Sequence, residues 1–120
     1  MIIEDDHEMR RMLRLILTSS GYTVFEAACD REALKVWQQS FSQIDLLLTD
    51  VCVPYRSTGM EIASKFLLEK SWLKVIYTSG FGVDIGRPHQ CSLVEGENFI
   101  QKPYAPEILL RILKRQLTPK

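Results

Sequence analysis

Two hydrophobic patterns alternate along the chain. Short runs of apolar and β-branched residues indicate strands, and stretches in which apolar residues recur every three or four positions indicate helices. The first pattern predicts five strands, at 1–3, 22–27, 44–49, 73–78 and 98–101. The second predicts helices between and after them, at 7–19, 31–40, 59–70 and 105–117. Residues 81–96 contain three glycines and a proline and show little periodicity, so any helix there is expected to be short or irregular.

Residues at the ends of these helices give further signals. Gly21 follows the first helix, as glycine does at many helix C-termini. Asp30 is the predicted N-cap of the second helix. Ala105 precedes Pro106 at the start of the last helix, where serine or threonine would cap better, at an expected cost of about 1 kcal/mol. The last helix is predicted to turn five apolar residues inward: Ile108, Leu109, Ile112, Leu113 and Leu117.

The alternation of strands and helices predicts a doubly wound α/β fold. Right-handed crossovers between parallel strands place helices on both faces of such a sheet. The run "IDLLLT" at 44–49 is apolar at consecutive positions, as expected for a strand buried on both faces. We expect a five-stranded parallel sheet in the flavodoxin-like order 2-1-3-4-5, which makes the first and third strands neighbours. No repeat or linker interrupts the chain, so residues 1–120 are predicted to form one domain.

Composition argues against several classes of function. Fifteen Lys plus Arg balance fifteen Asp plus Glu, so the chain lacks the positive field that attracts nucleic acids and acidic membranes. The three cysteines, Cys29, Cys52 and Cys91, form no disulfide or metal-binding pattern. No apolar run approaches the roughly 20 residues of a membrane helix, and no signal sequence opens the chain. We therefore expect a cytoplasmic protein that contacts neither nucleic acid nor membrane.

Polar side chains gather at the ends of the predicted strands. Ligands of open parallel sheets bind at the carboxyl ends of the strands. Seven residues fall there: Glu4, Asp5 and Asp6 after the first strand, Asp50 after the third, Thr78 and Ser79 at the end of the fourth and Lys102 after the fifth. Taken singly, each is more often a turn former, a helix cap, a strand former or a surface charge. Their common position favours a chemical role.

The types of these residues indicate which chemistry. Carboxylates that lie close together raise one another's pKa unless a cation lies between them. Oxygen ligands without imidazole or thiolate select Mg²⁺ or a similar ion, which also binds phosphate. Lys102 can contact a phosphoryl oxygen as a point charge, and Thr78 can do so as a hydroxyl donor. The set therefore suits transfer of a phosphoryl group onto a carboxylate.

Four motifs in this order and spacing point to a family. They are "IIEDD", "LLLTDVCVP", "YTSG" and "FIQKP". With them, the chain resembles the receiver domain of two-component response regulators over essentially its full length. The resemblance implies that Asp50 is the phosphoacceptor and that Lys102 and Thr78 position the phosphoryl group. It also implies a cis bond between Lys102 and Pro103.

A metal site and a conformational switch are also implied by the resemblance. Asp5, Asp50 and the backbone carbonyl of Cys52 would bind Mg²⁺ directly, and Glu4 would act through water. Thr78 and Phe99 occupy the positions of the family's switch pair. In that pair the hydroxyl moves toward the phosphate and the aromatic ring turns inward, which shifts the population between two packings of one fold.

The implied phosphodonor is a sensor histidine kinase or a histidine phosphotransfer domain. Two stretches most resemble receivers attached to hybrid sensor kinases: "VPYRSTG" and "YTSGFG". In the first, the spacing from Pro54 to Gly59 is one residue longer than the commonest receiver spacing. Such a domain is a signalling module and not an enzyme, since it catalyses only its own phosphorylation and dephosphorylation. An effector, fused or separate, would read its state, and the sequence identifies neither effector nor kinase.

Two other functions stay open on the residues alone. A Mg²⁺-dependent hydrolase of small phosphoesters could use the same carboxylates, although Cys52 stands two residues after Asp50, where such an enzyme would need a second aspartate. A pseudo-receiver would bind a partner without being phosphorylated. The complete set of acids, threonine and lysine argues against it.

Overall fold

The computed structural model describes residues 1–50, 58–80, 94 and 96–118. Its strands are β1 (Ile2–Ile3), β2 (Glu26–Ala27), β3 (Leu46–Asp50), β4 (Lys74–Ser79) and β5 (Phe99–Gln101). Its helices are α1 (His7–Ser19), α2 (Asp30–Ser40), the 3₁₀ turn η1 (Phe41–Gln43), α3 (Thr58–Glu69) and α4 (Pro106–Leu117). The predicted elements are all present, with bounds that shift by a few residues. The predicted irregular segment falls almost entirely outside the described residues.

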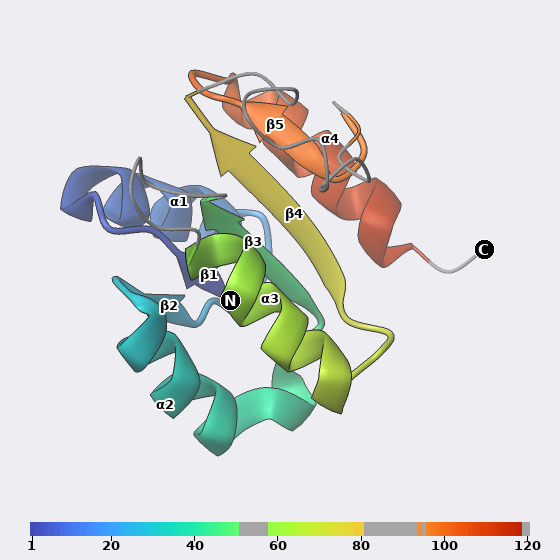
Figure 1. Cartoon of the computed structure of the whole chain (residues 1–120). Coiled ribbons are helices and arrows are strands. Elements are labelled where there is room, and N and C mark those ends of the chain that lie inside the picture. The colour runs from blue at the N-terminus through green and yellow to red at the C-terminus, as the bar shows by residue number, and fades with distance from the viewer. Residues whose placement is uncertain (51–57, 81–93, 95, 119–120) are drawn as a thin grey trace.

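The five strands form one parallel sheet in the order β2-β1-β3-β4-β5, which confirms the predicted fold (Figure 1). Ile3 of β1 pairs with Thr49 of β3, and Asp50 of β3 pairs with Thr78 of β4. Because all strands run the same way, the residues that follow them emerge at one edge of the sheet. That edge carries the polar residues singled out in the sequence.

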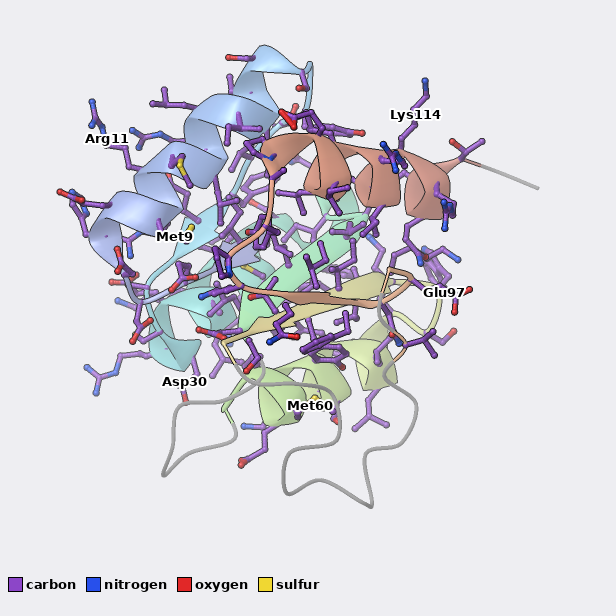
Figure 2. The ribbon with its side chains drawn as sticks, turned by 90° about the horizontal axis from the view of Figure 1, so that it is seen from above. Met9, Arg11, Asp30, Met60, Glu97 and Lys114 are labelled. Atoms are coloured by element: carbon purple, nitrogen blue, oxygen red, sulfur yellow. The ribbon has the colours of Figure 1, made fainter. Side chains whose placement is uncertain are left out.

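Helices cover both faces of the sheet, as predicted (Figure 2). On one face, α2 and α3 bury a core that includes Trp37, Phe66 and Leu47. On the other face, α1 and α4 bury a second core that includes Leu13 and Leu109. Neighbouring residues of β3 point into different cores, which explains why the strand is apolar at three consecutive positions, Leu46, Leu47 and Leu48.

The edge strand β2 is shorter than the predicted strand at 22–27. Only Glu26 and Ala27 pair with β1, and the preceding Val24 and Phe25 are half-buried beside the sheet. The alternating sequence marked the apolar positions correctly, but β1 has just two residues with which β2 can pair.

Two predictions about the helices are wrong. Asp30 is the first residue of α2, and Cys29 occupies the N-cap without a side-chain hydrogen bond. The Asp30 carboxylate accepts the Arg31 N–H at 2.9 Å, while Glu32 accepts the Ala28 N–H at 2.7 Å and stabilises the helix start instead. Ile108 is 38% exposed, since it lies about 100° around α4 from the buried Leu109.

Ala105 is the N-cap of α4 and makes no side-chain cap hydrogen bond, as its residue type predicted. Gly21 follows α1 with φ of 95°, a left-handed conformation that suits glycine. Over the ranges that the structure describes, no helix combines the length and the apolar character needed to cross a bilayer.

Candidate phosphoryl-transfer site

Three carboxylates converge at the carboxyl edge of the sheet. Glu4 and Asp5 follow β1, Asp50 ends β3, and these two strands are neighbours. One carboxylate oxygen from each of the three residues lies within 4.8 Å of the others. Glu4 is buried at 3% exposure, Asp50 is half-buried and Asp5 is exposed. Oxygen ligands at this spacing fit a small hard cation such as Mg²⁺.

Lys102 joins two of these carboxylates. Its Nζ donates to Glu4 Oε1 at 2.8 Å and to Asp50 Oδ2 at 3.2 Å. The backbone holds the lysine in place, because the Lys102 N–H donates to the carbonyl of Ser79 at 2.8 Å. The following Lys102–Pro103 peptide bond is cis. A cation thus bridges the ends of the first, third and fifth strands.

Burial and pairing shift the pKa values of this pair. Burial raises the pKa of the Glu4 carboxyl, against the lowering effect of its hydrogen bonds with Lys102 and the Asp6 amide. Burial alone would lower the pKa of Lys102, but the hydrogen bonds and charges of Glu4 and Asp50 outweigh it and leave that pKa raised. Lys102 is therefore held as a cation, while Glu4 depends on that cation to stay ionised.

The connection from β1 to α1 separates the roles of the three successive acids. Asp6 is the N-cap of α1, and its carboxylate accepts the Met9 N–H at 3.0 Å. The Asp6 N–H in turn donates to Glu4 Oε2 at 3.1 Å. Asp6 therefore starts the helix, while Glu4 and Asp5 face the convergence point with Asp50.

The other predicted residues lie at nearby positions. Thr78 is 3% exposed and stands opposite Asp50 in the β3–β4 register. Phe99 of β5 pairs with Tyr77 of β4, and its ring is 1% exposed in the core under α3. The aromatic side chain is thus enclosed in the core. Cys52, whose carbonyl was expected to bind the metal, lies outside the described residues.

Sequence reasoning missed two residues near the site. Arg10 of α1 donates from Nη1 to the backbone carbonyl of Glu4 at 2.8 Å. Tyr104 follows the cis peptide, and its enclosed hydroxyl has no hydrogen-bond partner among the described residues. Burial raises the pKa of Tyr104 to about 12. Neither the hydrogen bond of Arg10 nor the burial of Tyr104 has a sequence signature, although the place of Tyr104 directly after "KP" could have drawn attention to this residue.

Comparison with known proteins agrees with the fold. The family model described as the response regulator receiver domain matches residues 1–114. The regulatory protein VanR of Enterococcus faecium is 29% identical over 117 residues, which cover 98% of this chain and 48% of that protein. The sensor kinase CckA of Brucella abortus is 28% identical over 118 residues, which cover 98% of this chain and 12% of that protein.

The chemotaxis protein CheY4 of Vibrio cholerae has a similar fold. Its crystal structure superposes with a TM-score of 0.79 at 24% identity, over 97% of this chain and 95% of that one. The match to CckA confirms the predicted resemblance to a kinase-attached receiver, but VanR is matched at nearly equal identity. The chain spans about half the length of VanR, and the prediction of a single domain stays a prediction.

Proposed function

We propose, since the chain belongs to the response regulator receiver family, that it accepts a phosphoryl group on the Asp50 carboxylate. Family membership makes it the receiver domain of a two-component response regulator. The convergence of the Glu4, Asp5 and Asp50 carboxylates with Lys102 Nζ 3.2 Å from Asp50 is the observation that carries the finer proposal. Asp50 ends a strand buried on both faces, so its carboxylate needs little reorganisation to act as a nucleophile.

The proposed donor is a phosphohistidine of a histidine kinase or of a histidine phosphotransfer domain. An oxygen of the Asp50 carboxylate attacks phosphorus, and an acyl phosphate O–P bond forms while the N–P bond to imidazole breaks. The leaving imidazole nitrogen keeps the electron pair and takes up a proton. Little covalent work is left to the protein, so its residues contribute mainly position and charge.

Mg²⁺ is the proposed cofactor, and the carboxylates of Asp5 and Asp50 would hold it, with Glu4 beside them. When bound, the ion would neutralise charge on the phosphoryl oxygens. The backbone carbonyl of Cys52 is proposed as a further ligand. The oxygen-only donor set, with its three carboxylate oxygens within 4.8 Å of one another, supports this choice of ion. Asp50 is proposed to carry both roles, because a carboxylate has two oxygens, one for the metal and one for the nucleophilic attack.

Lys102 and Thr78 are proposed to position the phosphoryl group. Lys102 already bridges Glu4 and Asp50, so a phosphoryl group on Asp50 offers its Nζ a closer and more highly charged acceptor. Thr78 stands opposite Asp50 in the sheet, which supports a role for its hydroxyl as the second donor. Phe99 is proposed as the aromatic partner in the switch. Because its ring is already enclosed, we expect repacking within the core and no large change in exposure.

Small-molecule phosphorylation tests the proposal. The wild-type chain, incubated with acetyl phosphate and Mg²⁺, should gain one phosphoryl group by intact-protein mass spectrometry, and the product should be labile to both acid and base. Asp50→Asn should gain none. Asp45→Asn is the matched control, because Asp45 is exposed and lies just before the first residue of the same strand, so this variant should be labelled like the wild type.

Other outcomes would support the alternative functions. Equal labelling of Asp50→Asn and wild type would overturn the assignment of the phosphoacceptor. Absence of labelling from acetyl phosphate and from phosphohistidine donors would favour a pseudo-receiver. Sustained release of phosphate from small phosphoesters, at many equivalents per chain, would favour a hydrolase.

A further inference from the structure

We propose that Arg10 is a positioning residue for the Mg²⁺ site, and that it acts by fixing the peptide that joins Glu4 to Asp5. The inference rests on the proposed function, because it concerns the same metal site. Arg10 lies in the early part of α1, and the next residue, Arg11, points away from the sheet into solvent (Figure 2). Two adjacent arginines therefore have different surroundings.

The guanidinium group of Arg10 has three neighbours. Nη1 donates to the Glu4 carbonyl oxygen at 2.8 Å, Nη2 lies 3.2 Å from His7 Nδ1, and Nε lies 3.6 Å from Glu26 Oε1 on β2. The side chain is only 17% exposed. Because the guanidinium is planar and its donors form a rigid fork, contacts on several sides fix the direction of each N–H. The hydrogen bond to the Glu4 carbonyl is therefore a directed one.

The backbone of Glu4 is held on both sides. Its N–H donates to the carbonyl of Ala27 at 3.0 Å, and its carbonyl accepts from Arg10. Since a peptide unit is planar, a fixed Glu4 carbonyl also fixes the Asp5 nitrogen and the position of the Asp5 α-carbon. Arg10 thereby sets the point from which the Asp5 side chain starts.

Asp5 depends on this constraint more than the other acids do. The Glu4 carboxylate is held by Lys102 and by the Asp6 amide, and the Asp50 carboxylate is held by Lys102. Asp5 is exposed, and its carboxylate accepts no hydrogen bond from any residue that the structure describes. Arg10 binds a carbonyl and none of the three carboxylates, so it orders the site without occupying an oxygen that a cation would use.

The sign of the effect on Mg²⁺ binding separates positioning from charge. Removal of a cation near three carboxylates should, through charge alone, strengthen the binding of another cation. Loss of positioning should weaken it by about 10-fold, the scale seen when a group that orients metal ligands is removed. Arg10→Met is therefore expected to bind Mg²⁺ about 10-fold more weakly. Arg10→Lys keeps the charge but lacks the fork and should also bind more weakly.

The experiment is a Mg²⁺ titration of the whole chain, followed through backbone amide chemical shifts. Arg14→Met is the matched control, because Arg14 lies one turn further along α1, pairs with the same Glu26 at 3.2 Å and makes no contact with Glu4. It removes the same charge and should stay within about 2-fold of the wild type. Thermal unfolding of each variant verifies that it is folded at the titration temperature, and Arg10→Lys replaces Arg10→Met if the latter is not.

Each result bears on the proposal. Mg²⁺ binding by Arg10→Met and Arg10→Lys that is as tight as in the wild type, or tighter, overturns the positioning role and leaves the proposed function intact. Equal weakening in Arg14→Met also overturns it, because the effect would then come from charge or from the contact with Glu26. A wild-type chain that binds no Mg²⁺ overturns the metal site itself, and this inference with it.

Discussion

Two lysines at opposite ends of the sheet are bonded in different ways. Lys102 lies at the carboxyl edge, with a side chain 20% exposed, and donates to the carboxylates of Glu4 and Asp50. Lys70 follows α3 at the amino edge and is only 3% exposed. Its Nζ donates to the backbone carbonyls of Phe41 at 2.8 Å and Ile44 at 2.5 Å. One cation is bonded to anions, and the other to neutral main-chain groups.

The difference lies in what each set of acceptors can become. A backbone carbonyl is neither protonated nor phosphorylated near neutral pH, so the acceptors of Lys70 stay neutral in the folded chain. The carboxylates of Glu4 and Asp50 can be protonated, and Asp50 is the proposed phosphoacceptor, so the charge on the acceptors of Lys102 can change. Lys70 therefore connects η1 to the end of α3. Its Nζ also lies 6.0 Å from the centroid of the Phe41 ring. Lys102 is suited to respond to chemistry.

Loss of each lysine should affect phosphorylation very differently. Lys102→Met removes a hydrogen-bond donor to Asp50, the proposed phosphoacceptor, and the rate of Asp50 labelling by acetyl phosphate should fall about 100-fold. Lys70→Met removes a cation at the far end of the sheet and should leave that rate within about 2-fold of the wild type, since distant charges are screened. Time courses by intact-protein mass spectrometry measure both. Similar rates for the two variants would remove the functional distinction between the lysines.

Loss of Lys70 should instead destabilise the fold. The two carbonyls that it binds would lose charge-assisted hydrogen bonds worth about 1.5 to 3 kcal/mol each, partly offset by the apolar methionine. We expect Lys70→Met to lower the free energy of unfolding by about 3 kcal/mol, measured from the urea midpoint. The control is Lys65→Met, which replaces an exposed lysine within α3 and should stay within about 0.5 kcal/mol of the wild type.

Sequence predicted the carboxyl edge well and the amino edge poorly, for a physical reason. The carboxyl edge is defined by parallel topology, because every strand that ends in a polar residue delivers it to the same place. Glu4, Asp50 and Lys102 could therefore be collected from strand ends alone. The partners of Lys70 are carbonyls 26 and 29 positions away, and every residue carries a carbonyl. Residue types alone could not distinguish this buried lysine from an exposed one.

The same reasoning explains the other errors. Asp30 fits the preference for an N-cap, but the cap is decided by where the backbone leaves the extended conformation, which occurs at Cys29. Ile108 fits the apolar spacing of α4, but three closely spaced residues of that helix already fill the space against the sheet. The contact of Arg10 with the Glu4 carbonyl was missed because its acceptor, like those of Lys70, belongs to the main chain.

High pH should destabilise the carboxyl edge. The pKa of Lys102 is raised, so its contribution is complete below its usual value of 10.5 and is lost as pH rises through the folded-state pKa. Burial raises the pKa of Tyr104 from 10.0 to about 12, so the folded chain keeps a proton that the unfolded chain loses in that interval. Tyr104→Phe should therefore recover up to about 2 kcal/mol at pH 12 relative to wild type.

Urea unfolding at pH 9 and at pH 12 measures this alkaline loss. The difference between wild type and Tyr104→Phe at pH 9 supplies the internal reference, because the Tyr104 phenol of the wild type is then protonated in both the folded and the unfolded chain. An equal fall in stability for both proteins between the two pH values would mean that Tyr104 takes no part. The remaining fall would then belong to Lys102 and the other alkaline groups.

Glu4→Gln should have the smallest effect, and it tests the comparison most directly. Burial raises the pKa of Glu4, so its ionised form depends on Lys102. Substitution by glutamine loses the ion pair, but it also removes the free-energy cost of burying a charged carboxylate. Lys102 keeps Asp50 as a partner and its side chain is 20% exposed, so no buried cation is left unpaired. We therefore expect the free energy of unfolding at pH 7 to change by less than about 1 kcal/mol, measured from the urea midpoint with the exposed Glu69→Gln as control. A loss above about 3 kcal/mol would show that the Lys102–Glu4 pair supports the fold as Lys70 does. A change near zero, beside a large loss for Lys70→Met, would mean that the chain keeps a buried acid at this edge for its chemistry, since the fold is as stable without its charge.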